Sequence, residues 1–276
     1  MNIRLNSVLL YVMLLSPLGL VAQRTHSFSA GLGTLYYYGD LTDQFNNALV
    51  RPAGTISYSR YFLSNLRFRA SLSYGELGAS DGDANAPGRT LRNLHFRSHL
   101  AEVSGVLIYE FLRDKNFGNS WQGKPHLSPY VFGGVALFNF NPKARFDGEW
   151  YELQPLGTEG QYIPGGNGPE AYSLIQFSAP VGIGINVRLS EYTGFSFEIG
   201  YRTTATDYID DISTVYPDFD ALAQTPNGSL AVELSERSLE GLFQPGDTRG
   251  NPGSNDSYFF TVFSIDYYLS RYASRD

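Results

Sequence analysis

The chain contains no cysteine, and beyond residue 22 it has no apolar run long enough to form a membrane-spanning helix. The absence of cysteine excludes disulfide bonds, and it also excludes a lipid anchor on a processed N-terminal cysteine. Basic residues are in the minority, with 20 Lys and Arg against 27 Asp and Glu, for a net charge of -7. Because nucleic-acid binders are typically basic, we expect no nucleic-acid partner.

Residues 1–22 have the pattern of a secretory signal peptide. Arg4 precedes an apolar core over residues 8–15, and the small residue Ala22 stands before Gln23. The alternative is a retained membrane helix, but the core falls short of the roughly 20 apolar residues that a span needs. We therefore expect a signal peptide over 1–22 and one exported domain over 23–276.

What the chain does contain is strict alternation of apolar and polar residues, most clearly over 195–202. Successive side chains of a strand point to opposite faces, so this stretch has one apolar and one polar face. The apolar set is Phe195, Phe197, Ile199 and Tyr201, and the polar set is Ser196, Glu198, Gly200 and Arg202. The apolar face is aromatic, and the whole chain has 20 Tyr and 19 Phe. After an export signal, this pattern is typical of an outer-membrane β-barrel, in which only alternate residues face lipid.

Eight segments of this kind predict an all-β fold, namely an eight-stranded antiparallel transmembrane β-barrel with long outer loops. The expected strands cover residues 27–38, 53–62, 66–77, 93–112, 128–140, 174–189, 195–202 and 258–269. In the fourth, Leu94, Phe96 and Leu100 share a parity with Glu102 and Ser104, which predicts a bulge or a change of phase.

The lengths of the connections predict the orientation of the barrel. Residues 39–52, 80–92, 141–173 and 209–257 form long connections, whereas 63–65 and 190–193 are short. Bacterial barrels have short periplasmic turns and long outer loops, so we expect both termini in the periplasm. The connection 113–127 is long for a periplasmic turn and contains Phe117 and Trp121. These two aromatic residues are candidate contacts for a partner, or else girdle residues that seat the barrel at the membrane interface.

Charged residues fall on the expected inward faces of the strands. They are Arg67, Arg69, Arg188, Glu198, Arg202 and Asp266. A barrel of eight strands is only wide enough to be filled by side chains, so we expect these residues to form an interior network of ion pairs. Without a partner, a buried charge costs several kcal/mol.

The sequence offers little chemistry for catalysis or cofactor binding. A hydrolase at the membrane rim would need Ser98 with His95 or His99, but Ser98 has the opposite parity to both histidines. Asp207, Asp210 and Asp211 could gather Ca²⁺ on oxygen ligands, although a solvated loop entrance or an Asp-capped turn explains them more simply. We expect no enzyme activity, no cofactor and no metal.

Several strings, spread in order over the exported part, resemble the PorG-like outer-membrane barrels of Bacteroidota, a component of the type IX secretion system. They lie at residues 38–41, 92–97, 129–135, 140–144, 157–161, 198–202, 206–213 and 249–251. The polar residues that carry the resemblance are Asp40, Arg92, Asn93, Glu159, Asp207, Asp210, Asp211 and Arg249. The long insertion between Asp218 and Arg249 departs from the family pattern, so no partner of that outer loop is carried over.

The resemblance implies a noncatalytic barrel that sits among outer-membrane lipids and contacts a periplasmic ring lipoprotein and its partner. Two other readings stay open on the sequence alone. One is a stand-alone structural or adhesive barrel whose outer loops bind a ligand. The other is a lipid-modifying barrel enzyme.

Overall fold

The computed structural model describes residues 26–42, 45–83, 87–112, 124–238 and 241–269. The expected signal peptide therefore lies outside the described residues. The strands are β1 (His26–Tyr38), β2 (Arg51–Leu63), β3 (Leu66–Ser80), β4 (His95–Glu110), β5 (His126–Phe146), β6 (Glu149–Glu152), β7 (Ile175–Arg188), β8 (Thr193–Thr204) and β9 (Ser257–Leu269). The helices are η1 (Asn47–Leu49), η2 (Asp81–Asp83), α2 (Pro87–Arg92), α3 (Phe219–Ala223) and α4 (Gly228–Ser235). Among the described residues, no helix is both long and apolar enough to cross a bilayer.

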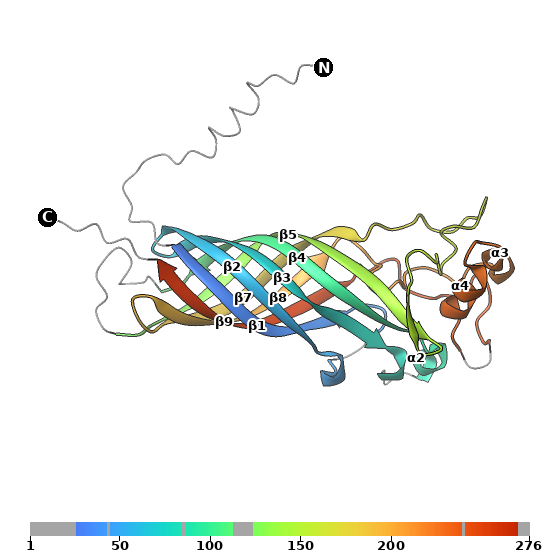
Figure 1. Ribbon diagram of the computed structural model, residues 1–276, viewed down its shortest axis with the longest axis horizontal. Coiled ribbons are helices and arrows are strands. Elements are labelled where there is room, and N and C mark those ends of the chain that lie inside the picture. The colour runs from blue at the N-terminus through green and yellow to red at the C-terminus, as the bar shows by residue number, and fades with distance from the viewer. Residues whose placement is uncertain (1–25, 43–44, 84–86, 113–123, 239–240, 270–276) are drawn as a thin grey trace, which may run out of the picture.

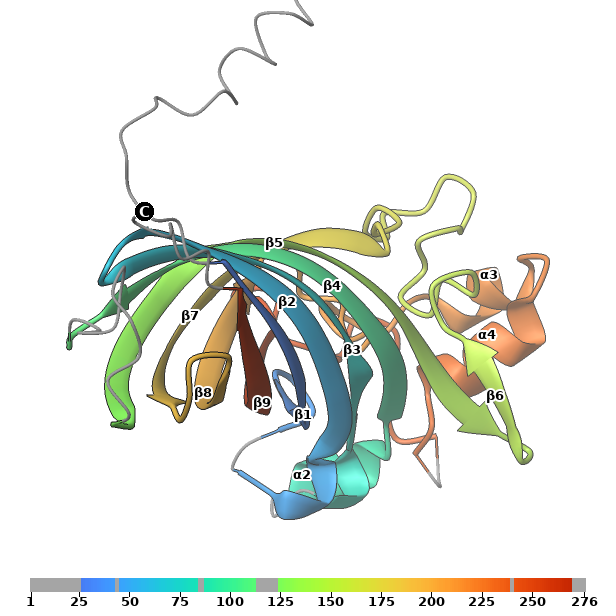
Figure 2. The same ribbon diagram turned by 60° about the vertical axis from the view of Figure 1, so that its left-hand side comes forward.

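Eight of the strands close into an antiparallel barrel, which confirms the predicted fold class. The order runs β4-β3-β2-β1-β9-β8-β7-β5, and β4 pairs in turn with β5. The first and last strands close the sheet in register from His26 opposite Leu269 to Tyr38 opposite Ser257. The remaining strand, β6, pairs only with the far end of β5, so that this hairpin projects beyond the barrel (Figure 2).

The outer surface of the barrel is an apolar belt. Leu32, Ile56, Val135 and Ile183 lie near the middle of their strands and are 79%, 60%, 70% and 62% exposed. Exposed aromatic residues lie close to the short turns, as in Phe62, Tyr109, Phe111, Tyr192 and Tyr267. An aliphatic band with an aromatic girdle on a closed barrel is the surface of an outer-membrane protein, because only lipid would cover it. The structure is thus an outer-membrane barrel.

The predicted irregularity in β4 is wrong. This strand pairs without a register shift with both β3 and β5, and its even-numbered residues from Phe96 to Glu110 are all buried. The expectation failed because it equated the inward face with polar residues. The interior is mixed, since Phe96 and Leu100 belong to an apolar core at one end of the barrel and Glu102 to the polar network. The register shift lies instead in the β2–β3 pairing, between Tyr61 and Leu63.

Strand β5 shows the same mixture on its inner side. Its aromatic face, with Tyr130, Phe132, Phe138 and Phe140, points inward and is buried. Glycines on the neighbouring strand leave room for it, since a Cβ at Gly184 would lie 2.3 Å from the Tyr130 ring. Large aromatic residues therefore fill the lumen where neighbouring strands carry glycine.

The long connections fold together over one end of the barrel. Figure 1 shows α2, α3 and α4 at this end, opposite the end where β1 begins and β9 finishes. Loop residues Leu41, Ile209 and Ile212 enter the same apolar core as the strand residues Tyr37 and Phe140. A second core joins the β5–β6 hairpin to α3 and α4, through Ala144, Leu153, Leu156, Leu222, Ala231 and Leu234. We call the long connections at this end the cap.

Candidate functional site

The strongest interaction inside the barrel is a two-bond ion pair between β3 and β8. Arg69 donates from Nη1 and Nη2 to the two carboxylate oxygens of Glu198, at 2.7 and 3.0 Å. Tyr130 of β5 donates a further hydrogen bond to Glu198 at 3.0 Å. Its carboxylate is therefore fully engaged, as a buried charge requires.

Two further ion pairs use acids that the sequence analysis did not single out. Arg67 lies with its Nε 3.2 Å from Glu110, and Arg202 lies with its Nε 3.6 Å from Glu102. Tyr258 also donates to Glu102, at 2.6 Å. Both acids lie on β4, whose inward parity could have identified them if the apparent change of phase had been ignored.

Of the last two expected residues, Asp266 binds neutral groups, and Arg188 contacts a turn. Asp266 accepts hydrogen bonds from Ser29 at 2.5 Å and Asn186 at 2.8 Å. Arg188 donates to the backbone carbonyls of Ser190 and Glu191 in the β7–β8 turn, and its guanidinium lies 4.5 Å from the centre of the Tyr268 ring. Arg188 thus stabilises the β7–β8 turn at the short-turn end of the barrel.

These side chains fill the barrel. The cavity left among them, lined by residues such as Ser71, Ser104 and Ser264, has a volume of about 20 Å³. That is room for about one water molecule. Among the described residues, the network therefore fills the lumen at its own level.

At the loop end a second polar cluster seals the mouth. We define the mouth cluster as Asp40, Asp81, Arg92, Glu159, Asp207, Asp210, Asp211, Arg249 and Asp256, together with Tyr37. All of these except Asp40 are at most 9% exposed. The cluster contains all but one of the polar residues that carry the family resemblance, although they come from widely separated segments of the sequence.

Arg92 joins three of these segments at the end of α2. Its Nε and Nη2 donate to the two carboxylate oxygens of Asp81, both at 2.8 Å. It also donates to the backbone carbonyls of Asp40, at 3.1 Å, and Arg249. Asn93, the remaining residue of the resemblance, has a positive φ of 57° and ends this helical turn. Its side chain donates to the carbonyl of Arg237 at 3.0 Å, which ties the turn to the cap.

Glu159 and Arg249 form the centre of the cap. Arg249 donates to Glu159 at 2.9 Å, and both residues are 2% exposed. Glu159 also accepts from the backbone amides of Ser213, at 2.8 Å, and Thr214, and from the Thr214 hydroxyl at 2.7 Å. One carboxylate thereby holds the loop that follows β8 in a single conformation.

Two of the three acids of that loop accept hydrogen bonds from different side chains. Asp211, with φ of 67°, accepts from the hydroxyls of Thr158 and Tyr172, while Asp210 accepts from Tyr37. Burial raises the pKa of Asp211 to about 6 against the lowering effect of Arg249, and it raises the pKa of Asp207 to about 7. The expectation of a solvated loop entrance is therefore wrong, because all three acids are buried. The alternative of an Asp-capped turn agrees with the structure at Asp210, whose side chain accepts from the backbone amide of Ile212.

The other sequence-based candidates are not brought together. In the part of the chain that the structure describes, no three His, Cys, Asp or Glu side chains are placed to hold a metal ion. Ser98 is buried inside the barrel, whereas His99 is exposed and stacks on Tyr74 outside it. Phe117 and Trp121 lie outside the described residues.

A family model described as a domain of unknown function (DUF6089) matches residues 6–232. The chain belongs to this DUF6089 family. No curated protein matches the sequence. The match ends within α4, so the family pattern includes the β-strands up to β8 and the Asp207–Asp211 loop, but not Arg249 or β9.

Solved structures similar to this DUF6089 chain are bacterial outer-membrane proteins. They include the attachment invasion locus protein Ail of Yersinia pestis, at 8% identity and a TM-score of 0.42, covering 90% of this chain and 99% of that one. Neisserial surface protein A has 9% identity and a TM-score of 0.41, with coverages of 88% and 95%. OprG of Pseudomonas aeruginosa has 10% identity and a TM-score of 0.40, with coverages of 91% and 98%. The assignment as a barrel rests on the strand pairing described above.

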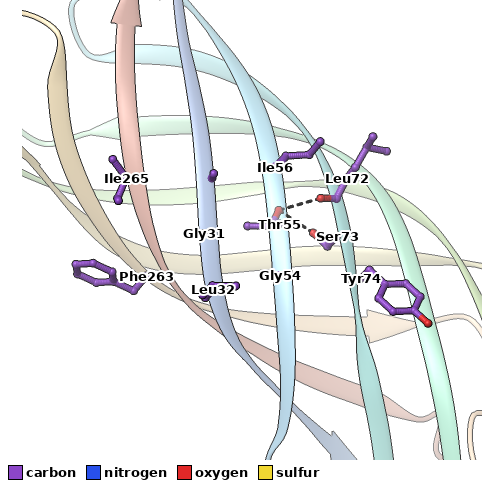
Figure 3. Close-up of a pocket in the computed structure, with 11 residues that line it drawn as sticks. Gly31, Leu32, Gly54, Thr55, Ile56, Leu72, Ser73, Tyr74, Phe263 and Ile265 are labelled. Carbon is purple, nitrogen blue, oxygen red and sulfur yellow. Dashed lines mark hydrogen bonds between the residues drawn. The ribbon is translucent and has the colours of Figure 1, made fainter.

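The outer face of the barrel has a shallow hollow of about 760 Å³ across β9, β1, β2 and β3 (Figure 3). Leu32, Ile56 and Leu72 frame it, and Gly54 leaves space between them. The hydroxyl of Thr55 donates to the backbone carbonyl of Leu72 at 3.2 Å, so this polar group is satisfied within the sheet. The hollow is part of the lipid-facing belt, where acyl chains would fill it.

Proposed function

We propose that this protein is a noncatalytic component of the type IX secretion system that anchors a periplasmic ring assembly in the outer membrane. In this proposal the short-turn end and both termini face the periplasm, and the cap faces outward. The partners are a ring lipoprotein and the protein that binds it.

The observation that carries the proposal is that the residues shared with the PorG-like barrels lie together in the structure. Asp40, Arg92, Glu159, Asp211 and Arg249 come from separate strings of the sequence, yet hydrogen bonds or ion pairs join them in one buried cluster. Residues that hold each other in place in this way are expected to be present together in every protein that shares the cluster. This supports a shared structural unit with the PorG-like barrels as the source of the resemblance.

The filled lumen supports an anchoring role over transport through the barrel. The space inside is about 20 Å³, and the cap covers the mouth. Such a barrel acts on partners through its ends or its outer surface. On the periplasmic side, the connection 113–127 exceeds what closing a hairpin requires, and it contains Phe117 and Trp121.

A pull-down in mild detergent tests the proposal. Residues 116–124 are replaced by a short Asn-Gly turn, and the affinity-tagged variant is compared with the unaltered protein. We expect the periplasmic ring proteins to be lost while the barrel still migrates faster unboiled than boiled. As the matched control, residues 164–168, an exposed turn in the cap, are replaced in the same way and should leave the ring proteins bound.

Full retention of the ring proteins by a folded 116–124 variant would exclude this connection as the docking segment. Absence of ring proteins from the unaltered sample would contradict the secretion role as a whole. The two results are distinct, because the second does not depend on any variant.

A stand-alone adhesive barrel is the second candidate, and one feature of the cap favours it. A hollow of about 700 Å³ opens between the loop 159–169 and the segment from Thr214 to Asp218. Its walls include Pro164, Pro169 and Pro217, which stiffen the backbone. Binding to cells that is lost in the 164–168 variant, without associated ring proteins, would favour this function.

A further inference from the structure

One tyrosine hydroxyl at the barrel mouth lies between two carboxyl groups. Tyr37 Oη is 2.6 Å from Asp210 Oδ2 and 2.8 Å from Asp256 Oδ1, and all three residues are at most 1% exposed. A hydroxyl carries one hydrogen and can donate it to one acceptor only. The second short contact is attractive only if that carboxyl group carries a proton and donates it to the hydroxyl oxygen. The geometry thus calls for one proton shared by the two acids.

The other oxygens of the two acids are occupied by backbone amides. Asp210 Oδ1 accepts from the amide of Ile212 at 2.9 Å, and Asp256 Oδ2 accepts from the amide of Ile209 at 2.8 Å. These oxygens must stay unprotonated, so the shared proton lies on the side of the tyrosine. The three residues connect β1, the loop after β8 and the residue before β9.

The surroundings do not compensate a second negative charge on this pair. The acids Asp40 and Asp207 face it, and both carboxylate oxygens of Asp207 are buried. Of the other groups that face it, Arg92 is bound to Asp81 and to two carbonyls, and the hydroxyl of Tyr172 is bound to Asp211. Glu159 acts on Asp207 as a further negative charge.

We propose that the Asp210–Tyr37–Asp256 trio is a proton-linked latch that holds the cap on the barrel mouth and releases it when the shared proton is lost to solvent. In the latched state Ile209 and Ile212 are buried in the apolar core of the mouth. Loss of the proton leaves two carboxylates that compete for one tyrosine hydrogen. Their repulsion then separates the loop after β8 from β1, and the cap opens.

The electrostatics agree with this direction. Burial, and the charges of the neighbouring acids, raise the pKa of Asp210 and of Asp256 well above the usual range, although hydrogen bonds from Tyr37 and the backbone act against this shift. A folded-state pKa above the unfolded value gives stability that is complete below the unfolded pKa and is lost as pH rises through the folded one. Acidic conditions therefore favour the closed cap, and alkaline conditions weaken it.

Hydrogen–deuterium exchange of the purified protein in detergent micelles tests the latch. Protection is measured from pH 5 to pH 9 for peptides covering 206–213, corrected for intrinsic exchange, with β5 as internal reference. Linkage to one proton gives up to about a tenfold loss of protection per pH unit between the pKa of the acid in the opened loop and the raised pKa of the closed pair, and the loss levels off above the latter. The β5 peptides should not change.

The variant Asp256→Asn separates the latch from other effects. An asparagine can accept from Ile209 and donate to Tyr37, so it imitates the protonated acid and should make protection of 206–213 independent of pH. The variant Asp210→Asn should behave in the same way, and it serves as the second test if the first does not fold. The matched control is Asp220→Asn, an exposed acid of α3 in the same cap, which should keep the pH dependence of the unaltered protein.

Three results would overturn the proposal. The first is protection of 206–213 in the unaltered protein that does not change with pH. The second is a pH dependence that survives in a folded Asp256→Asn or Asp210→Asn variant. The third is a pH dependence that Asp207→Asn alone removes, which would assign the proton to Asp207 instead of the pair.

Discussion

Replacing Arg69 by methionine should destabilise the barrel strongly, because it leaves Glu198 buried without its cation. In the structure Arg69 supplies two of the three hydrogen bonds that Glu198 accepts, and only the bond from Tyr130 would remain. Methionine keeps much of the volume of the arginine stem but has no charge. The change therefore isolates the electrostatic part of the interaction.

The expected magnitude follows from the distance and the burial. Two unit charges about 4 Å apart attract by about 4 kcal/mol at the effective dielectric constant near 20 that applies to proteins. This agrees with the 3–5 kcal/mol that is typically lost when one partner of a buried pair is removed. The double variant Arg69→Met/Glu198→Met removes both charges and should recover most of that loss, since an apolar pair needs no compensation.

The assay is equilibrium unfolding in urea with lipid vesicles, with the folded fraction read from the faster migration of unboiled barrel. The matched control is Arg51→Met. Arg51 is 39% exposed and its ion pair with Glu76 is 3.7 Å long, so it should cost at most about 1 kcal/mol. If Arg69→Met costs no more than Arg51→Met, or if the double variant is as unstable as the sum of its single variants, the interior pair does not stabilise the fold as argued.

Two further substitutions test the assignment of the strand faces, in the same unfolding assay. Phe197 is 43% exposed on the lipid-facing side of β8, so Phe197→Leu should be mild, whereas Phe197→Arg should cost about 2–4 kcal/mol near the bilayer midplane. Equal tolerance of arginine at positions 197 and 198 would show that the faces are reversed. Arg202→Leu should cost about 3 kcal/mol, the low end for a broken buried pair, because Arg202 lies 3.6 Å from Glu102 whereas Arg69 makes two short hydrogen bonds to Glu198. A loss larger than that of Arg69→Met would contradict this ranking.

The strands could be read from the sequence because their information is local. Alternation places Phe197 outside and Glu198 inside whatever the neighbouring strand is, and the structure agrees at both positions. The pairing partners could not be read in the same way. Arg202 shares a face with Glu198 in the sequence, yet its ion pair is with Glu102 on a strand one hundred residues earlier, since the interior brings opposite walls of the barrel together.

The cap was less accessible to sequence reasoning, because its contacts join segments far apart in the chain. Nothing local indicates that Arg92 reaches the carbonyl of Arg249, or that Tyr37 reaches Asp256. Apolar loop residues such as Ile209 give a partial signal, since a solvated loop would not need them. The strings that resemble the PorG-like barrels contain most residues of the mouth cluster, but only the structure shows that these residues lie together.

The distribution of charge limits what the barrel can do. Among the described residues, the interior network between the strands contains four arginines, at 67, 69, 188 and 202, and four acids, at 102, 110, 198 and 266. The network between the strands is therefore balanced in charge, so it creates no strong field of one sign. The long loops are not free extensions either, because Arg92, Arg249 and Tyr37 hold them on the mouth. A molecule built in this way presents three surfaces: the lipid-facing belt, the exposed surface of its cap and the short-turn end. Because the cap is attached through ionisable groups, the cap is the one of these three that the proposed latch makes sensitive to pH.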